Sequence, residues 1–234
     1  MAFDALLDSP LFGITLTIGA MVLFQLLFRK THNPLLNPQI FAIIGIIVFL
    51  KLTGVTYQTY NQGGQVISFF LGPVTVALAV PLYRQFDKLK KNAAPILLGI
   101  FAGTVTAVLA TVGLSLLFHL NREMIASLAP KATTTAIAME LSQVLGGIPS
   151  LTVAFVILAG LTGFIIGEQW LNVFHIKSRI ARGIGLGTAS HALGTTRALL
   201  MGEEEGAMSS LAIGVAGIMT SILLPVFMRW VLPL

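Results

Sequence analysis

Long apolar runs separated by short charged clusters are the feature that most constrains how this chain folds. Asp, Glu, Lys and Arg make up 10% of its 234 residues, whereas they make up about 25% of a soluble domain. Each helical crossing of a bilayer needs about 20 predominantly apolar residues. The runs therefore predict an all-α, polytopic membrane protein with about seven to eight membrane segments. They exclude a disordered chain, and the absence of Cys excludes a disulfide scaffold.

The positions of the basic residues predict the topology. These residues gather in three places, at 29–30, 84–91 and 177–182, and such clusters mark the cytoplasmic side of a membrane. The third cluster lies on the same side of the membrane as the first two only if the segment 125–149 enters and leaves the membrane on one face. We therefore predict a re-entrant hairpin, or a pair of half-helices, near Pro130. The net charge of +5 is assigned to this topology because no basic helix with interleaved aromatics is present to bind nucleic acid.

One transmembrane domain is predicted over residues 1–234. It comprises N-terminal spans at 11–60, two broken-helix units at 65–172, and a polar segment with a last span at 183–232. The mostly polar residues 57–65 are expected to form a link. Because the N-terminus has no basic region and no small-residue cleavage site, the first apolar run is expected to be retained as a helix rather than removed as a signal peptide.

A weak internal repeat lies within the two broken-helix units. The segment 73–82 resembles 130–141, since each begins with proline and continues with a Thr-x-Ala pattern that ends in Leu. Secondary transporters are commonly built from such repeats, and their interrupted helices meet at the bilayer midplane. The alternative is coincidence among small apolar residues. The spacing leaves open whether the repeats are parallel or inverted.

The two interrupted helices supply the first predicted site. Proline inside a membrane helix removes a hydrogen bond, and the N-terminus of a half-helix offers free N–H groups and a positive dipole end that suit a carboxylate. We predict that a small carboxylate substrate lies between the two breaks, where it contacts residues of both: Pro73, Thr75, Lys131, Thr133 and Thr134. The alternative is a pair of proline kinks whose hydroxyls bond to backbone carbonyls.

Two charged residues lie within the second broken segment. A charge inside a membrane segment costs about 2.5 to 3.5 kcal/mol and usually faces a cavity or a partner. Lys131 is predicted to hold the anionic substrate, and Glu140 is predicted to bind the coupling ion, a proton or sodium. The alternative for Lys131 is a position at the mouth of the hairpin, from which its amine reaches the lipid headgroups.

A polar segment at 187–197 supplies the third set of predicted site residues. His191 can titrate near physiological pH, and Arg197 can bind a carboxylate with two hydrogen bonds. In a continuous helix, Gly187, His191 and Gly194 share one face. This face predicts the lining of an anion path that includes four side chains: Ser190, His191, Thr195 and Arg197. The alternative is an amphipathic helix at the membrane surface, with Arg197 among the headgroups.

Motifs for catalysis are lacking. Ser190 and His191 are neighbours and no acid has the spacing of a hydrolase triad. The glycines at 183–187 lack the strand and helix that flank a dinucleotide-binding loop, and no spacing typical of metal ligands occurs. We therefore expect no enzyme activity, no metal and no cofactor.

Five segments together resemble the LrgB/CidB family, and they occur in order from about residue 60 to the C-terminus: 71–83 (LGPVTVALAVPLY), 130–140, 146–152 (GGIPSLT), 190–195 and 202–211. The chain departs from the family pattern at Ala132, where the family often has Ser, and at Ala136, where it often has Pro. The second departure makes the helix break near Pro130 less pronounced than in the family.

The resemblance implies two functions. One is antiholin-like or holin-like regulation of murein hydrolase export and cell lysis, together with a small membrane partner of the LrgA/CidA type. The other is transport of glycolate, glycerate or pyruvate. The broken helices and buried cations favour alternating-access transport of a small 2-hydroxy or 2-oxo monocarboxylate, because a holin-type lesion needs no anion-sized site. Regulation remains the alternative, and a homo-oligomer is possible in either case.

Overall fold

A computed structural model describes most of the chain, namely residues 7, 9–31, 37–70, 72–73, 76, 83, 86–91 and 93–231. The described residues contain helices, turns and links but no strand, which confirms the all-α prediction for this part of the chain. Four of the described helices are long and apolar enough to cross a membrane. The count of about seven to eight segments and the internal repeat remain predictions, and most of the first repeat copy, 74–75 and 77–82, lies outside the described residues.

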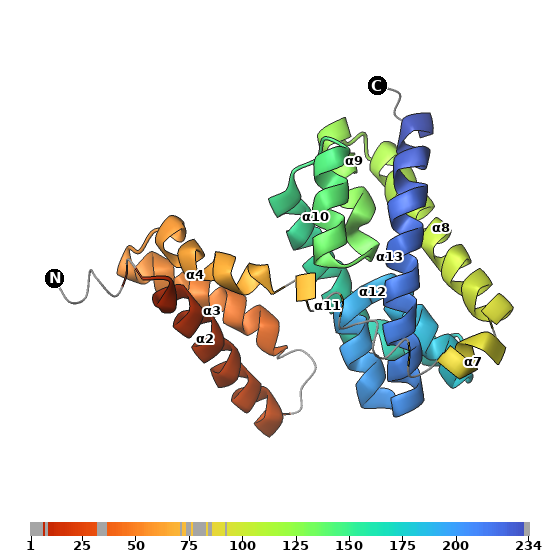
Figure 1. The fold of residues 1–234 in the computed structure, drawn as a ribbon, viewed down its shortest axis with the longest axis horizontal. Coiled ribbons are helices and arrows are strands. Elements are labelled where there is room, and N and C mark those ends of the chain that lie inside the picture. The colour runs from red at the N-terminus through yellow and green to blue at the C-terminus, as the bar shows by residue number, and fades with distance from the viewer. Residues whose placement is uncertain are drawn as a thin grey trace. The chain divides into compact units, whose positions relative to one another are not determined.

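The first of two compact units covers Met1–Thr75. Its helices are α2 (Pro10–Thr31), α3 (Pro38–Thr53) and α4 (Tyr57–Phe69) (Figure 1). The prediction of a link at 57–65 is wrong, because these residues belong to α4. The side chain of the residue before α4, Thr56, accepts a hydrogen bond from the Thr59 backbone N–H and so caps the helix start.

Close contact between α2 and α4 depends on Gly13. A Cβ added there would overlap the Tyr60 carbonyl oxygen, whereas a Cβ at Gly19 of the same helix would meet no atom within 4 Å. We expect Gly13→Ala to lower the free energy of unfolding by about 1–3 kcal/mol through overpacking. Gly19→Ala is the matched control. Thermal unfolding in detergent measures both, and equal midpoints would contradict the contact.

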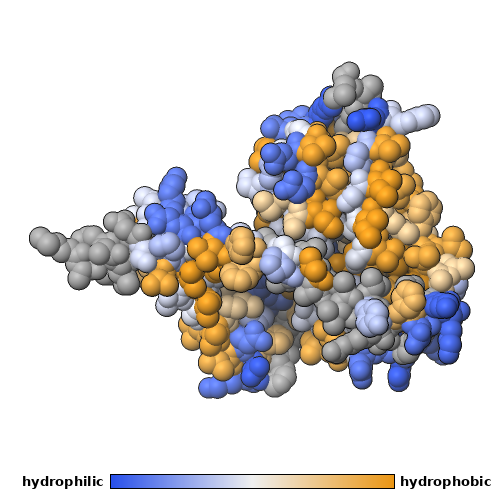
Figure 2. Space-filling view, in the orientation of Figure 1, coloured by the Kyte–Doolittle hydropathy of each residue, from blue (hydrophilic) through white to orange (hydrophobic). Residues whose placement is uncertain are grey.

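The second unit covers Val76–Leu234 and contains three of the candidate spans, α8 (Ala93–Leu117), α11 (Pro149–Val173) and α13 (Glu203–Val231). At 1.5 Å per residue, a 25-residue helix is about 38 Å long and exceeds the roughly 30 Å hydrocarbon core. Figure 2 shows apolar surface along α8 and α13, as expected for helices that face lipid.

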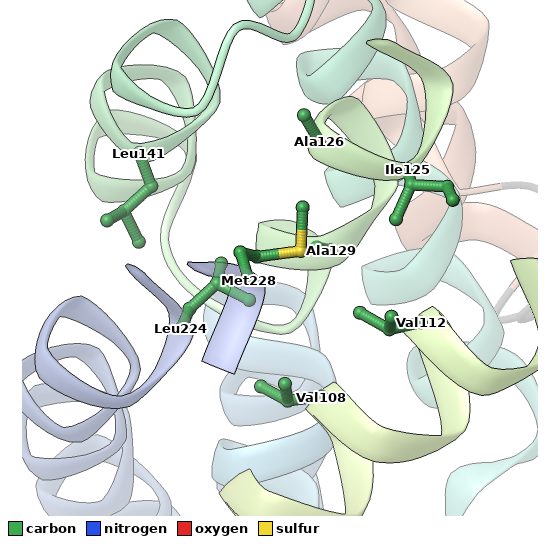
Figure 3. Packing of buried hydrophobic residues seen from close by; sticks show 8 residues of the cluster. All are labelled: Val108, Val112, Ile125, Ala126, Ala129, Leu141, Leu224 and Met228. Carbon is green, nitrogen blue, oxygen red and sulfur yellow. The ribbon is translucent and has the colours of Figure 1, made fainter. Parts of the chain in front are cut away.

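Two apolar clusters establish the directions of these helices. At one end, Ile96 and Ile100 of α8 pack with the first turns of α13, including Met208. At the other end, Val112 of α8 packs with Leu224 and other residues near the end of α13 (Figure 3). Therefore α8 and α13 run parallel to each other.

The segment between α8 and α11 is a helical hairpin. It consists of α9 (Arg122–Leu128), a 3-10 turn η1 (Ala129–Ala132) and α10 (Thr135–Val144). The hairpin closes where the Ile148 N–H donates to Ser127 Oγ at 2.8 Å. Two short helices therefore flank the break near Pro130, and their re-entry into a membrane remains a prediction. Since α11 starts at the same end at which α8 stops, α11 runs antiparallel to α8.

The helix α12 (Arg179–Met201) is a second hairpin, which the sequence did not predict. Its backbone reverses at His191, where φ is 39° and ψ is −127°. Both arms contact the same residue of α13: a Cβ at Gly187 would overlap the Ser209 carbonyl, and Thr195 Oγ1 lies 2.7 Å from Ser209 Oγ. The prediction of one continuous face for Gly187, His191 and Gly194 is therefore wrong, since Gly194 folds back against Leu186.

The two hairpins enter this unit from opposite ends. The first lies at the end where α8 stops, and the outer ends of α12 lie beside the first turn of α13, where Arg179 approaches Glu205 at 4.0 Å (Figure 1). The basic residues of α7 (Phe86–Lys91), which precedes α8, and those at 177–182 therefore lie at one end of the unit. The second and third basic clusters thus share one end of the unit, and the side of a membrane that this end faces remains a prediction.

Candidate functional site

The tips of the two hairpins meet inside the second unit. We call residues Ala129–Thr134 tip 1 and residues Ser190–Leu193 tip 2. Lys131 of tip 1 and Ser190 of tip 2 line the same groove, and the imidazole of His191 lies close to Lys131. Thr133 of tip 1 lies beside Gly217, near the middle of α13. The meeting point is therefore about halfway along the longest spanning helix.

Tip 1 forms because its sequence interrupts a helix in two ways. Pro130 occupies the first turn of η1, where its missing N–H costs nothing. Thr133 then adopts an extended backbone, with φ of −128° and ψ of −178°. The side chain of Thr134 caps α10 by accepting a hydrogen bond from the Ile137 N–H at 3.5 Å. The positive dipole end of α10 therefore begins at the tip.

Tip 2 lies against a glycine-lined face of α11. A Cβ added at Gly160 would lie 3.0 Å from His191 Cε1, and one at Gly163 would overlap the Ser190 hydroxyl. His191 itself has a positive φ, a conformation that favours glycine. Such strain costs about 1–3 kcal/mol and tends to occur at functional sites. The surrounding packing therefore holds an unfavourable backbone in place at the tip.

Lys131 provides the positive charge at the meeting point. Its Nζ donates to Thr111 Oγ1 of α8 at 2.8 Å, and the side chain is half-buried. No carboxylate among the described residues pairs with this ammonium group. Its charge is therefore compensated only by a hydroxyl, which leaves it available to an anion.

Each tip carries a buried polar atom without a hydrogen-bond partner. Within the described part of the chain, Thr133 Oγ1 and His191 Nε2 have no hydrogen-bond partner, and neither do Thr104 Oγ1 of α8 and Thr188 Oγ1 of α12. Each of these residues is at most 5% exposed. A buried polar group without a partner costs about 1–3 kcal/mol, and native structures usually satisfy it with water or a ligand. These atoms and Lys131 are suited to a small polar anion.

Arg197 lies within the second arm of α12 and is paired with an acid. Its Nη2 is 2.5 Å from Glu168 Oε2 of α11, and Arg182 Nη2 lies 3.8 Å from the other carboxylate oxygen. The sequence interpretation overlooked Glu168. The available signal was an ionisable residue inside an otherwise apolar span, which is by itself a functional indication. A direct contact between Arg197 and a substrate remains a prediction.

The other predicted site residues are distributed as follows. Ser190, a residue of tip 2, is buried against Gly163 of α11, and Thr195 is buried against α13. Glu140 is exposed on α10, and its role with a coupling ion remains a prediction. Pro73 belongs to the first unit and is exposed there, while Thr75 lies outside the described residues. A carboxylate between the breaks at Pro73 and Pro130 is therefore also still a prediction.

A groove of about 660 Å³ runs along α11 and α12. Lys131 and Ser190 contribute polar atoms to it, and its other lining residues are mostly apolar, such as Phe155 and Trp170. The groove that leads to the tips is thus largely apolar. No group of three or more His, Asp or Glu side chains in the described residues is placed to hold a metal ion.

Comparisons with known proteins identify the family to which this chain is similar. The LrgB-like family matches residues 17–230. A protein of Bacillus subtilis (strain 168) named antiholin-like protein LrgB is 41% identical over 222 residues, which cover 94% of this chain and 96% of the relative. A protein of the same name from Bacillus cereus (strain B4264) is 40% identical over 224 residues, 95% of this chain and 97% of the relative. No solved structure matches the chain.

These matches extend over nearly the whole chain and include both hairpins. The resemblance carried by the five sequence segments is therefore confirmed. With four long apolar helices and relatives of this name and similarity, the chain is a membrane protein that belongs to the LrgB-like family.

Proposed function

We propose that this protein carries a small monocarboxylate, such as a 2-hydroxy or 2-oxo acid, across a bacterial inner membrane by alternating access. The observation that supports this proposal most is the meeting of two hairpin tips around Lys131. In secondary transporters, substrate sites lie near the bilayer midplane where helices are interrupted. The hairpins enter from opposite ends, so movement of either tip opens the site to one side.

The chemistry at the tips suits one negative charge. The Lys131 ammonium supplies a cation, and the N-terminus of α10 supplies a positive dipole end. The unpartnered Thr133 hydroxyl and His191 Nε2 supply hydrogen bonds for a hydroxyl or oxo group next to the carboxylate. A dianion would leave one charge uncompensated in a site of low dielectric constant, which is costly. A monocarboxylate is therefore the favoured class.

The second candidate is regulation of murein hydrolase export and lysis with an LrgA/CidA-type partner. It is favoured by the names of the relatives, which are called antiholin-like proteins. The names support this candidate better than they support transport, and the geometry of the tips supports transport. A regulator requires no cation beside unpartnered hydroxyls at the meeting point of two hairpins.

Uptake into proteoliposomes tests the proposal. Labelled glycolate, glycerate and pyruvate are offered with and without an imposed proton or sodium gradient, in the presence and absence of an LrgA-type protein. We expect saturable uptake of at least one acid, with discrimination between the enantiomers of glycerate. The same protein expressed in cells is scored for autolysis. Absence of uptake under all conditions, together with altered autolysis, would support the regulatory function instead.

A further inference from the structure

Glu168 connects both arms of the α12 hairpin to α11. Arg182 belongs to the first arm and Arg197 to the second, and one carboxylate faces both guanidinium groups. Arg182 also donates from Nη1 to the Ile176 carbonyl oxygen at 3.4 Å, which ties the start of the hairpin to the preceding link. A single acid on α11 thus contacts both arms of the hairpin.

The ion-pair cluster is partly shielded from water. The side chains of Arg182 and Arg197 are 17% and 19% exposed, and that of Glu168 is 30% exposed. The Nε atoms of both arginines are buried without partners. Charge pairs of this kind are screened less than those at an open surface. Removing the carboxylate would leave two cations facing each other across the hairpin, so the arms would tend to separate.

Glu168 is also in register with tip 2. On the same helix, Gly163 adjoins Ser190, and Gly167 adjoins Leu186 of the first arm. The ion pairs therefore lie one residue beyond the glycine-lined face that receives the tip. They prevent α12 from sliding along α11, and such a slide would move His191 away from Lys131.

We infer that Glu168 is a positioning residue of the proposed carrier: it holds both arms of α12 on α11, so that tip 2 keeps Ser190 and His191 beside Lys131. This inference rests on the proposed function. It also gives Arg197 a partner within the chain.

Kinetics of uptake test the role of Glu168. If the carboxylate only positions the tip, Glu168→Gln reduces the fraction of assembled sites, and the apparent affinity falls by that fraction. We expect KM to rise about ten-fold, with a smaller change in the maximal rate per folded protein. The exposed Glu203→Gln is the matched control and should match wild type. The conservative variant Glu168→Asp keeps a carboxylate opposite both Arg182 and Arg197 and should show a smaller rise in KM than Glu168→Gln.

A second measurement does not depend on transport. The chain has no Cys, so spin labels can be attached to cysteines placed at Thr162 of α11 and Thr196 of the second arm. Both residues are exposed, and each hydroxyl bonds only to its own helix. We expect Glu168→Gln to broaden the distance distribution between the labels, whereas Glu203→Gln leaves it narrow.

The outcomes separate the two proposals. A broadened distribution in a protein that takes up no acid would support the positioning role and contradict the transport function. A distribution and a KM equal to those of Glu203→Gln would overturn the positioning role, even if wild-type uptake is saturable. A lower yield of folded protein with unchanged KM would likewise overturn it, because that result shows a purely structural role.

Discussion

Lys131→Met abolishes saturable uptake while the protein still reaches the membrane in normal amount. The Lys131 ammonium is the cation at the meeting point of the tips, and Thr111 is its only hydrogen-bond partner among the described residues. A hydrogen bond to a charged group contributes about 1.5–3 kcal/mol. Lys131→Met removes both the charge and the hydrogen bond that the ammonium group would donate to the substrate, which predicts a decrease in uptake of roughly 100-fold.

Folding is expected to survive this substitution. Methionine has a similar length and flexibility, and no ion pair is broken, because no described carboxylate pairs with Lys131. Lys177→Met is the control, since Lys177 is exposed at the end of the unit. Uptake by Lys131→Met that equals uptake by Lys177→Met would show that the meeting point of the tips does not hold the anion.

Gly187→Ala lowers the stability of the protein more than a matched substitution two residues away. The first arm of α12 approaches α13 so closely that a Cβ at Gly187 would overlap the Ser209 carbonyl oxygen. That oxygen is backbone inside a long helix, so it cannot move without displacing the helix. Overpacking of this kind costs about 1–3 kcal/mol, which predicts a thermal midpoint lower by roughly 3–10 °C.

Gly185→Ala is the control that separates the effect of the contact between Gly187 and α13 from the effect of helix propensity. Gly185 lies on the same arm, is exposed, and would place its Cβ 3.8 Å from the nearest atom, Leu171 Cδ2. Both substitutions gain similar backbone propensity, so their difference reports the contact with α13. Unfolding midpoints measured by tryptophan fluorescence in detergent provide the comparison. Equal midpoints would mean that α12 and α13 are not in close contact at Ser209.

Parts of the site could be predicted from the sequence because their causes are local. Pro130 next to Lys131 in an apolar segment indicates both a helix break and a buried charge, and each follows from a few neighbouring residues. Glu168 could have been predicted in the same way as Lys131, since it is an acidic residue in an apolar span. It was overlooked because nothing near it in the sequence indicates a partner. Arg182 and Arg197 become its partners only through the hairpin.

The reversal at His191 has no local signal. The residues 187–197 are compatible with a continuous helix, and histidine at a positive φ is unfavourable. What compensates this strain is the packing of both arms on α13, at Gly187 and Thr195, and of the tip on α11, at Gly163. These contacts join residues that are distant in the sequence, so no periodicity reveals them.

The sequence by itself determined that the chain is helical, belongs in a membrane and has a break near Pro130, because hydropathy, charge asymmetry and proline act over a few turns of helix. Only the tertiary structure decided that tip 2, at His191, meets tip 1, which carries Lys131. That choice depends on the glycine face of α11 and on Glu168, which together bring tip 2 to tip 1. The physical reason is that such pairing is determined by the shape and charge of neighbouring helices, and neither is encoded in any single segment.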